Sequence, residues 1–378
     1  MNRDVIDRPH EKYDRLLAAA RATPAIRTAV VHPCDPIALE SALEAAKAGL
    51  IDPVLVGPAA KIRAAAGLAG CDISALPLID AAHSHEAAAL AVAQVREGRV
   101  QALMKGSLHT DELMGAVVSR DTGIRTARRV SHCFVMDIPG HEIPLIITDA
   151  AVNIAPTLEE KVDIVQNAIE LAHALRFEEV RVAILSAMET VNPKVPSTIE
   201  AAALCKMADR GQITGALLDG PLALDNAIDP EAARVKGIRS AVAGRANVLV
   251  VPDLETGNVL AKSLSFLAGA DAAGIVLGAK VPIILTSRAD SLLTRLASCA
   301  VGPNYKQPDT ADITPATRTW TIDVTPPAAT VTTGPTGPTN DSTPTFEFTT
   351  AGATITECRF DATFFLACTS PFTPAIAL

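Results

Sequence analysis

The sequence predicts an α/β protein with two α/β domains and mostly parallel sheets, followed by a different C-terminal segment. Three observations carry this prediction. Up to about residue 302, short runs of Val, Ile and Leu alternate with Ala-rich helical stretches. These runs are continuously apolar, which is typical of strands buried on both faces of a parallel sheet. The length of 378 residues agrees with two or three domains.

Strand and helix positions follow from these patterns. Residues 36–48 and 159–175 repeat apolar residues at helical spacing, and Thr157 with Glu160 three positions later predicts a capping box. The alternation of strand and helix favours parallel sheets covered by helices. Nine apolar runs are expected to be strands, namely 28–31, 53–56, 102–104, 145–147, 180–185, 216–218, 248–251, 274–277 and 282–285.

The C-terminal segment, residues 303–378, has its own composition. It holds eight of the twelve aromatic residues, ten of the 26 prolines and twenty threonines. Short β-like runs at 344–349 and 353–360 are separated by Gly-Pro and Asn-Asp turns. We therefore expect a β-rich or disordered tail.

Charge and cysteine usage exclude several classes of protein. A net charge of -9 argues against a nucleic-acid-binding protein with a basic face. No run of 18 apolar residues predicts a membrane helix, and the polar N-terminus does not resemble a secretory signal. The cysteines are seven, an odd number, and the five up to Cys299 are widely scattered, which favours free thiols in a reducing cytoplasm.

Several common site motifs are missing from the sequence. No G-x-G-x-x-G follows a predicted strand, and neither a G-x-x-x-x-G-K-[ST] loop nor a G-x-S-x-G elbow occurs. No Cys and His spacing fits zinc, so no metal site is expected. His83 and His85 are interpreted as surface or helix-cap residues.

Small and polar residues follow many of the predicted strands. They occur at 105–107, 148–150, 219–221, 253–258 and 287–288. In open α/β sheets, ligands bind at the carboxyl ends of the strands. Turn formation alone explains any single loop, but several such loops in one sheet predict a shared site.

Two arginine-containing segments fit an anionic ligand. Arg120, Arg125, Arg128 and Arg129 lie within ten residues, and Arg288 directly follows a predicted strand. The planar guanidinium group suits bidentate recognition of phosphate. The alternative for the first segment is a solvated loop.

Seven segments closely resemble the phosphate acetyltransferase and phosphate butyryltransferase family. They are MKGSLHTDELM (104–114), ARRVSHCFVMD (127–137), ITDAAVNIAPTLEEK (147–161), VNPKVPSTIEAAAL (191–204), KMADRGQITGALLDGPLALDNAI (206–228), VPDLETGNVLAKSL (251–264) and GADAAGIVLGAKVPIILTSRADS (269–291).

This resemblance implies reversible acyl transfer, in which acyl-CoA and phosphate give acyl phosphate and CoA. It implies two α/β domains with an interdomain cleft, in an architecture like that of isocitrate and isopropylmalate dehydrogenases. We expect residues 1–148 with 275–302 to form the first domain, 149–274 the second, and 303–378 the tail. The resemblance also implies a cytoplasmic homodimer with no bound cofactor, no nucleic acid and no membrane.

The resemblance also implies roles for individual residues. Ser287 matches a family serine that hydrogen-bonds the reacting centre, and Arg288 matches a neighbouring arginine that holds phosphate or CoA. Arg129, or less closely Arg125, matches a second phosphate contact. Lys105 is expected to bind substrate at a strand end.

The identity of the thiol base stays open. The acetyl branch has an aspartate seven residues after its serine, where this sequence has Thr294. Asp290 is the nearest carboxylate, and the strand-end residues Asp149, Asp219 and Asp253 are alternatives. Asp219 and Asp253 are in any case expected to line the substrate site.

One loop of the family has a counterpart in this chain. Gly257 and Asn258 resemble the turn and the polar contact of a family loop. Lys262 shares a face with Asn258 if a helix begins there. All three are expected to take part in binding substrate.

The tail resembles a bacterial immunoglobulin-like surface repeat. Such a repeat implies a disulfide between Cys358 and Cys368 outside the cell, whereas reduced thiols are expected in a cytoplasmic enzyme. The last helix of the transferase portion, about 290–300, is expected to stop before Pro303.

Three other functions stay open: transfer of butyryl instead of acetyl, an NAD-dependent decarboxylating dehydrogenase, and an inactive chain or surface-binding module. Acyl chain length does not follow from the sequence.

Overall fold

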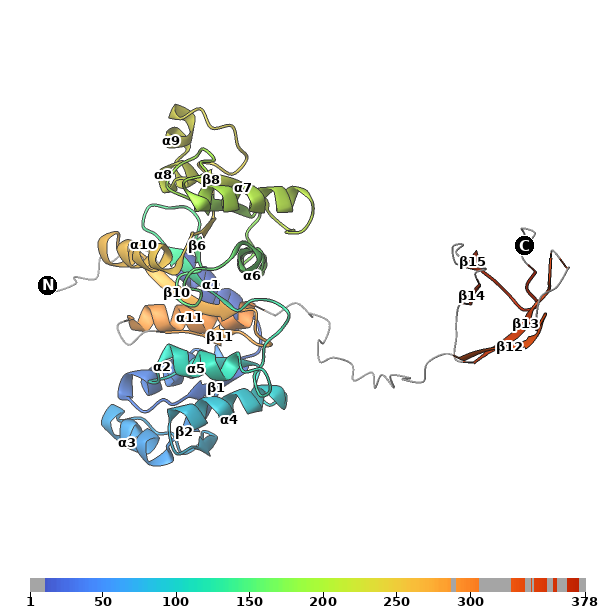
Figure 1. The fold of residues 1–378 in the computed structure, drawn as a ribbon. Coiled ribbons are helices and arrows are strands. Elements are labelled where there is room, and N and C mark those ends of the chain that lie inside the picture. The colour runs from blue at the N-terminus through green and yellow to red at the C-terminus, as the bar shows by residue number, and fades with distance from the viewer. Residues whose placement is uncertain are drawn as a thin grey trace. The chain divides into compact units, whose positions relative to one another are not determined.

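One eleven-stranded sheet runs through the first of two units of the chain (Figure 1). A computed structural model describes residues 11–286, 290–305, 328–336, 341, 343–351, 356–358 and 366–373. The units are residues 1–313 and 314–378. In chain order the first unit contains α1 (Glu11–Arg21), β1 (Ile26–Val31), α2 (Pro36–Lys47), β2 (Ile51–Gly57), α3 (Ala59–Ala69), β3 (Leu78–Asp80), α4 (Ser84–Arg96), β4 (Ala102–Lys105), α5 (Thr110–Val117), β5 (Ser131–Asp137), β6 (Leu145–Thr148), α6 (Leu158–Ala174), β7 (Arg181–Leu185), α7 (Pro196–Asp209), β8 (Leu217–Leu222), α8 (Leu224–Ile228), α9 (Pro230–Val235), β9 (Val248–Val250), α10 (Leu254–Leu267), β10 (Asp271–Leu277), β11 (Ile283–Ile284) and α11 (Leu292–Asn304).

The sheet consists of two parallel halves joined by antiparallel strands. Its order is β3-β2-β1-β4-β11-β10-β5-β6-β9-β7-β8. The strands from β3 to β11 are parallel to one another, and so are those from β6 to β8. Because β10 and β5 pair antiparallel with all their neighbours, the two halves run in opposite senses. We call the carboxyl ends of β1 to β4 and β11 the first edge, and those of β6 to β9 the second edge.

Helices cover both faces of each half. In the first half, α4 and α5 pack on one face while α2, α3 and part of α11 pack on the other. In the second half, α6 and α7 pack on one face and α8, α9 and α10 on the other. Because both faces are covered, the strands bury continuous apolar runs, as their composition predicted.

The α/β class is confirmed, and each of the nine predicted runs overlaps a strand. The Thr157 capping box is confirmed at the start of α6. The prediction missed β3 and β5. The first is only three residues long, and the second contains Ser131 and His132 within an apolar run. The strand ends do not all lie at one edge, because β10 and β5 reverse the sense of the second half.

Helix α11 runs further than expected. It continues through Pro303 to Asn304 instead of stopping near residue 300. A proline in the last turn removes one backbone hydrogen bond, but burial of Val301 and of Tyr305, which is 3% exposed, keeps this end packed.

The second unit is β-rich where it is described, in agreement with the expectation for the tail. Strand β12 (Ala328–Thr333) pairs antiparallel with β13 (Glu347–Ala351), and β14 (Glu357–Cys358) pairs antiparallel with β15 (Leu366–Ala367). Cys358 and Cys368 form a disulfide, so the expected reduced thiols are not found. Among the described helices, none has the length and apolarity required to cross a membrane.

Candidate active site

Three neighbouring strands bring candidate residues together at the first edge. The register pairs Val31 with Lys105 across β1 and β4, and β11 lies on the other side of β4. His32, Lys105 and Thr286 therefore lie at the ends of adjacent parallel strands. Such an edge is where α/β sheets bind ligands.

The predicted catalytic segment continues from this edge into α11. Ser287 and Arg288 lie outside the described residues. Beyond them Asp290 is half-buried and has a polar partner, and Ser291 caps α11 by accepting the backbone N–H of Thr294 at 3.1 Å. The amino end of a helix of this length favours an anion.

The turn after β4 packs directly on the end of β1. The Gly106 N–H donates to the Val31 carbonyl at 2.9 Å. A Cβ at position 106 would lie 2.4 Å from that carbonyl oxygen and 2.7 Å from the one of His32. Only glycine fits here, and the close approach places Lys105 and Ser107 beside His32.

His32 has a backbone conformation that is rare for a side-chain-bearing residue, with φ of 55°. Its carbonyl accepts three hydrogen bonds, from Cys34 N at 2.8 Å, Ser107 N at 3.0 Å and Ser107 Oγ at 2.7 Å. The imidazole Nδ1 lies 3.3 Å from Ser107 Oγ. Burial, and then the charge of Lys61, lower the pKa of His32.

Neighbouring groups at this edge are less suited to chemistry. Burial raises the pKa of the Cys34 thiol to about 11, so it is not a thiolate nucleophile. A hollow of about 450 Å³ opens beside α4 and α5, but its lining includes Asp111 and Glu112. Two carboxylates repel phosphate, so we exclude this hollow as the phosphate site.

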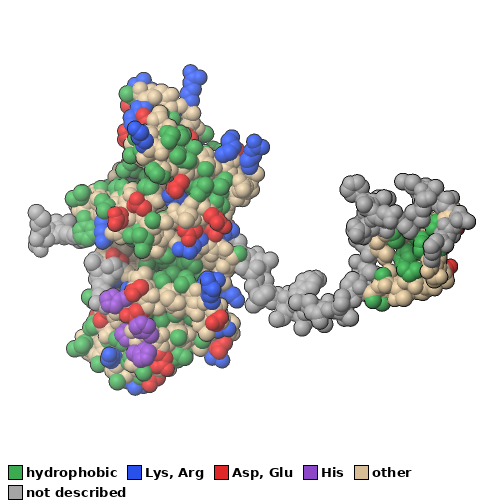
Figure 2. All heavy atoms as spheres, viewed as in Figure 1, with side chains coloured by type: hydrophobic (Ala, Val, Ile, Leu, Met, Phe, Trp, Pro, Cys, Tyr) green, Lys and Arg blue, Asp and Glu red, His purple; other side chains and the backbone are tan. Residues whose placement is uncertain are grey.

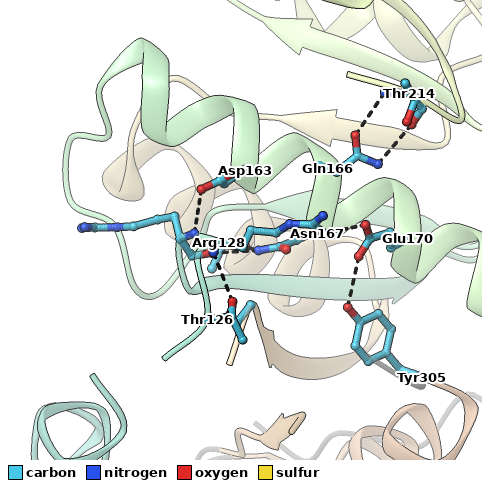
Figure 3. A network of polar contacts seen from close by, with 11 residues as sticks. Thr126, Arg128, Asp163, Gln166, Asn167, Glu170, Thr214 and Tyr305 are labelled. Atoms are coloured by element: carbon cyan, nitrogen blue, oxygen red, sulfur yellow. Dashed lines mark hydrogen bonds and ion pairs between the residues drawn. The ribbon is translucent and has the colours of Figure 1, made fainter. Parts of the chain in front are cut away.

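The arginine loop, residues 120–130, lies at the second edge and is clamped to α6 (Figure 3). Thr126 Oγ1 donates to the Gly278 carbonyl at 2.6 Å and accepts the N–H of Arg128 at 3.1 Å. Arg128 forms an ion pair at 2.5 Å with Glu170, and both side chains are largely buried. Glu170 also accepts the Tyr305 hydroxyl at 3.4 Å. Arg128 is thus a structural residue.

The backbone of Arg129 is held on both sides. Asp163 accepts its N–H at 2.7 Å, and Asn167 donates to its carbonyl at 2.9 Å (Figure 3). The Arg129 guanidinium donates to Asn153 Oδ1 at 2.7 Å and forms an ion pair with Glu160 at 2.9 Å.

Arg125 differs from its neighbours in the loop. It is exposed and, within the described ranges, has no ion pair. Of the arginines predicted to bind substrate, Arg125 therefore has the freer guanidinium.

Asp149 is the centre of the turn after β6. Its carboxylate accepts hydrogen bonds from four backbone N–H groups, at His132, Ala151, Val152 and Asn153, and from the Asn153 side chain at 2.6 Å. Asn153 is 3% exposed and bonds Arg129 on its other side. Asp149 therefore organises the second edge and has no free oxygen for proton transfer.

The start of α10 packs on the same turn. Asp253 caps this helix by accepting the N–H of Thr256 at 2.8 Å. A Cβ at Gly257 would lie 2.7 Å from the Asp149 carbonyl oxygen, and Asn258 Nδ2 donates to the Ala150 carbonyl at 3.3 Å. The expected loop at 257–258 is thus wrong, because the Asp253 cap begins a helix before it.

Two further site predictions fall on α10 and β8. Lys262 is exposed and shares α10 with Asn258, as predicted. Asp219 lies within β8 and not after a strand, and its carboxylate accepts the N–H of Gly220 at 2.8 Å. β8 can continue through Pro221 because it is an edge strand, where a missing N–H is tolerated.

The predicted residues thus form two groups instead of one. Lys105 and the segment around Asp290 belong to the first edge, whereas Arg125, Arg129 and the α10 residues belong to the second. Helix α11 spans 13 residues between Ser291 and Tyr305, the partner of Glu170. At 1.5 Å per residue this helix is about 20 Å long.

His32 is the residue at the first edge that the sequence prediction missed. It directly follows the predicted strand 28–31, so the rule that selected Lys105 would also have selected it. Figure 2 shows histidine side chains gathered on the half of the fold that carries α2 to α5. His83 caps α4 as expected. No three His, Cys, Asp or Glu side chains form a metal site within the described ranges.

Comparison with known proteins gives one consistent family. Residues 82–301 match the family described as phosphate acetyl/butaryl transferase. A phosphate acetyltransferase from Rhizobium meliloti is 66% identical over 294 residues, which cover 78% of this chain and 93% of that protein. A phosphate butyryltransferase from Clostridium acetobutylicum is 38% identical over 291 residues, covering 77% and 97%.

Solved structures agree with this result. A branched-chain phosphotransacylase from Enterococcus faecalis V583 superposes with a TM-score of 0.65 at 29% identity, covering 74% of this chain and 98% of that one. The family match ends at residue 301, before the second unit begins.

Proposed function

Because the chain belongs to the phosphate acetyltransferase and phosphate butyryltransferase family, we propose that it transfers an acetyl group reversibly between CoA and inorganic phosphate. Acetyl-CoA and phosphate give acetyl phosphate and free CoA. The observation that carries this proposal is the 66% identity to a phosphate acetyltransferase, over 93% of that protein. Butyryl transfer is the second candidate, supported by the more distant butyryltransferase at 38% identity.

We place the chemistry at the first edge. Phosphate and the phosphoryl group of acetyl phosphate need cations and N–H donors, and Lys105 with the amino end of α11 offers both. Arg288 joins them as the guanidinium contact, and Ser287 hydrogen-bonds the reacting carbonyl or the leaving oxygen. Well-placed oxyanion donors of this kind lower the barrier by about 3 kcal/mol each.

Among the carboxylates considered for the thiol base, we retain Asp290, and the contacts of the other three support this choice. Asp149 uses both oxygens in structural hydrogen bonds. Asp253 caps α10, and Asp219 lies on the β8 edge strand. Asp290 is the carboxylate next to Ser287 and Arg288.

The arginine loop takes a different role from the one expected. Arg129 follows Arg128, which pairs with Glu170 near the end of α11, whereas Ser291 caps the start of that helix. We assign Arg125 and Arg129, with Lys262 on α10, to the phosphates of the extended CoA molecule. Gly257 and Asn258 support this edge by packing on the Asp149 turn.

The test is phosphate-dependent release of thiol from acetyl-CoA. Ser287→Ala and Arg288→Ala should each lower the rate by about a hundredfold, as removal of a transition-state contact does. Ser74→Ala and Arg63→Ala change exposed residues and are matched controls with unchanged rates. Unchanged rates for both site variants would refute the site, whereas absence of thiol release in wild type would refute the function.

A homodimer is also part of the proposal. Helix α10 exposes Val259, Phe266 and Leu267 to 64%, 63% and 87%, and nearby Ile154 is 76% exposed. Apolar side chains in such a group favour a contact with another protein surface. Light scattering should give twice the 39.3 kDa of one chain. Leu267→Asp should give the monomer mass, and a monomeric wild type would contradict the proposal.

We propose a cytoplasmic location. Five cysteines of the first unit, Cys34, Cys71, Cys133, Cys205 and Cys299, are free thiols, which favours a reducing compartment. Fractionation of intact cells should then recover the chain with the cytosolic proteins, and recovery from the periplasm or the medium would contradict this location.

A further inference from the structure

We propose that His32 is a proton acceptor for the CoA thiol at the first edge. This inference rests on the proposed function and names a catalytic residue that the sequence prediction did not include. A thiol with an ordinary pKa near 8.5 is mostly protonated at neutral pH, so its attack on acetyl phosphate needs a base or an electropositive site.

The position of His32 follows from the strand order. β1 and β11 flank β4, so the carboxyl ends of β1 and β11 are separated by two interstrand spacings, or about 10 Å. His32 ends the first strand, Lys105 the second, and Thr286 follows the third. A small substrate held by Lys105 above β4 therefore lies beside the imidazole.

The hydrogen bonds determine which ring nitrogen of His32 is the acceptor. Ser107 has one hydroxyl proton, and it is donated to the His32 carbonyl at 2.7 Å. Ser107 Oγ therefore acts as acceptor for Nδ1–H of His32 at 3.3 Å, just as it accepts the N–H of Cys34 at 3.0 Å. With the proton on Nδ1, Nε2 carries a lone pair. Within the described part of the chain, no hydrogen bond uses Nε2.

The backbone at His32 is held in an unusual conformation. A left-handed φ of 55° is disfavoured for any residue with a Cβ, and such residues cluster at functional sites. His32 N donates to Val56 O at 2.7 Å, and the Gly106 turn closes over its carbonyl. The fold thus fixes the imidazole at the edge of the sheet instead of letting it move with a loop.

Burial, together with the charge of Lys61, favours the neutral imidazole of His32. Burial and Lys61 on α3 lower its pKa, while Glu112 on α5, the backbone and Asp35 raise it less. The pKa therefore lies below 6.5, and the ring accepts a proton at neutral pH.

The step is balanced as follows. The thiol proton moves to Nε2 of His32 as the sulfur attacks the carbonyl carbon of acetyl phosphate. The new S–C bond forms, and the C–O bond to phosphate breaks with its electron pair on the phosphate oxygen. The phosphate then takes the proton from Nε2, which restores neutral His32 and releases monohydrogen phosphate.

The test uses the full chain with His32→Asn and His32→Gly. Both residues tolerate a left-handed backbone, and neither carries an imidazole. We expect thiol transfer to fall by about a hundredfold, the usual contribution of general-base catalysis. Added imidazole should restore part of the rate of His32→Gly. His173→Gln, at an exposed residue of the other half of the fold, should retain the wild-type rate.

The pH profile gives the second readout. In wild type, kcat/KM should fall on the acid side with an apparent pKa below 6.5, and both His32 variants should lose this limb. The role of His32 is refuted if its variants keep rates within twofold of wild type and the same decrease at acid pH. It is also refuted if only Asp290→Asn removes that decrease. Both results leave the proposed acyl transfer intact. Absence of thiol release in wild type refutes the proposed function instead.

Discussion

Replacing His132 should change how the stability of the first unit depends on pH. His132 lies on β5 at the centre of the sheet, is 0% exposed, and stacks edge-on against Phe134 at 4.4 Å. Among the residues that the structure describes, neither ring nitrogen of His132 has a hydrogen-bond partner. Burial lowers the pKa of this imidazole to about 4, although the nearby Asp149 charge raises it.

The size and sign of the effect follow from this pKa. The unfolded chain binds a proton at His132 near pH 6.5, whereas the folded chain does so only near pH 4. Between these two pH values the unfolded state binds more protons than the folded state. The contribution of neutral His132 to the free energy of unfolding is therefore complete above pH 6.5 and is lost as the pH decreases. By linkage the loss is about 2 kcal/mol at pH 5 and about 3 kcal/mol below pH 4.

The measurement is urea unfolding of wild type and His132→Phe at pH 7.5 and pH 5, followed by far-UV circular dichroism. The single tryptophan, Trp320, lies in the second unit, so its fluorescence would not report on the helices of the first. Phe fills similar space without a titrating group. Between pH 7.5 and pH 5, the free energy of unfolding of wild type should fall by about 2 kcal/mol relative to that of His132→Phe. A difference that stays constant between the two pH values would refute the burial of a neutral imidazole.

Three further predictions concern the packing that supports the site. Gly106→Ala puts a Cβ 2.4 Å from the carbonyl oxygen of Val31 at the end of β1. It should lower the free energy of unfolding in urea by about 1–3 kcal/mol and the rate of thiol release at least tenfold. Wild-type values for both would show that the turn can move to make room for the methyl group. Glu170→Ala leaves Arg128 as an unpaired, largely buried charge and should lower the free energy of unfolding in urea by about 3 kcal/mol. A decrease of less than about 1 kcal/mol would show that water reaches the guanidinium. A chain ending after Tyr305 should melt like the full chain, whereas one ending after Gly302 should melt several degrees lower, because Tyr305 is buried; equal melting temperatures would contradict this.

Strand positions were predictable because buried parallel strands are continuously apolar. The capping box at Thr157 was predictable because its hydrogen bonds are local. Strand sense was not predictable, since β10 is as apolar as the parallel strands of the sheet, and its antiparallel pairing with β11 and β5 depends on distant segments. The antiparallel pairings of β10 and β5 send the ends of the two halves to opposite edges.

The site was predictable in part. Lys105 was found at a ligand-binding edge because strand ends are visible in the sequence. Asp149 and Asp253 look like free carboxylates in the sequence, yet their oxygens are used by backbone N–H groups that only folding brings close. His32 was missed although it also follows a predicted strand, because only the left-handed backbone and the Ser107 contact distinguish it from other strand-end residues.

The most direct test of the account is a thiol-release assay with acetyl-CoA and butyryl-CoA, with and without phosphate. We expect phosphate-dependent release of CoA, faster with acetyl-CoA, and a loss of about a hundredfold in Ser287→Ala. If a folded preparation releases no thiol from either substrate when phosphate is added, the proposed acyl transfer is contradicted.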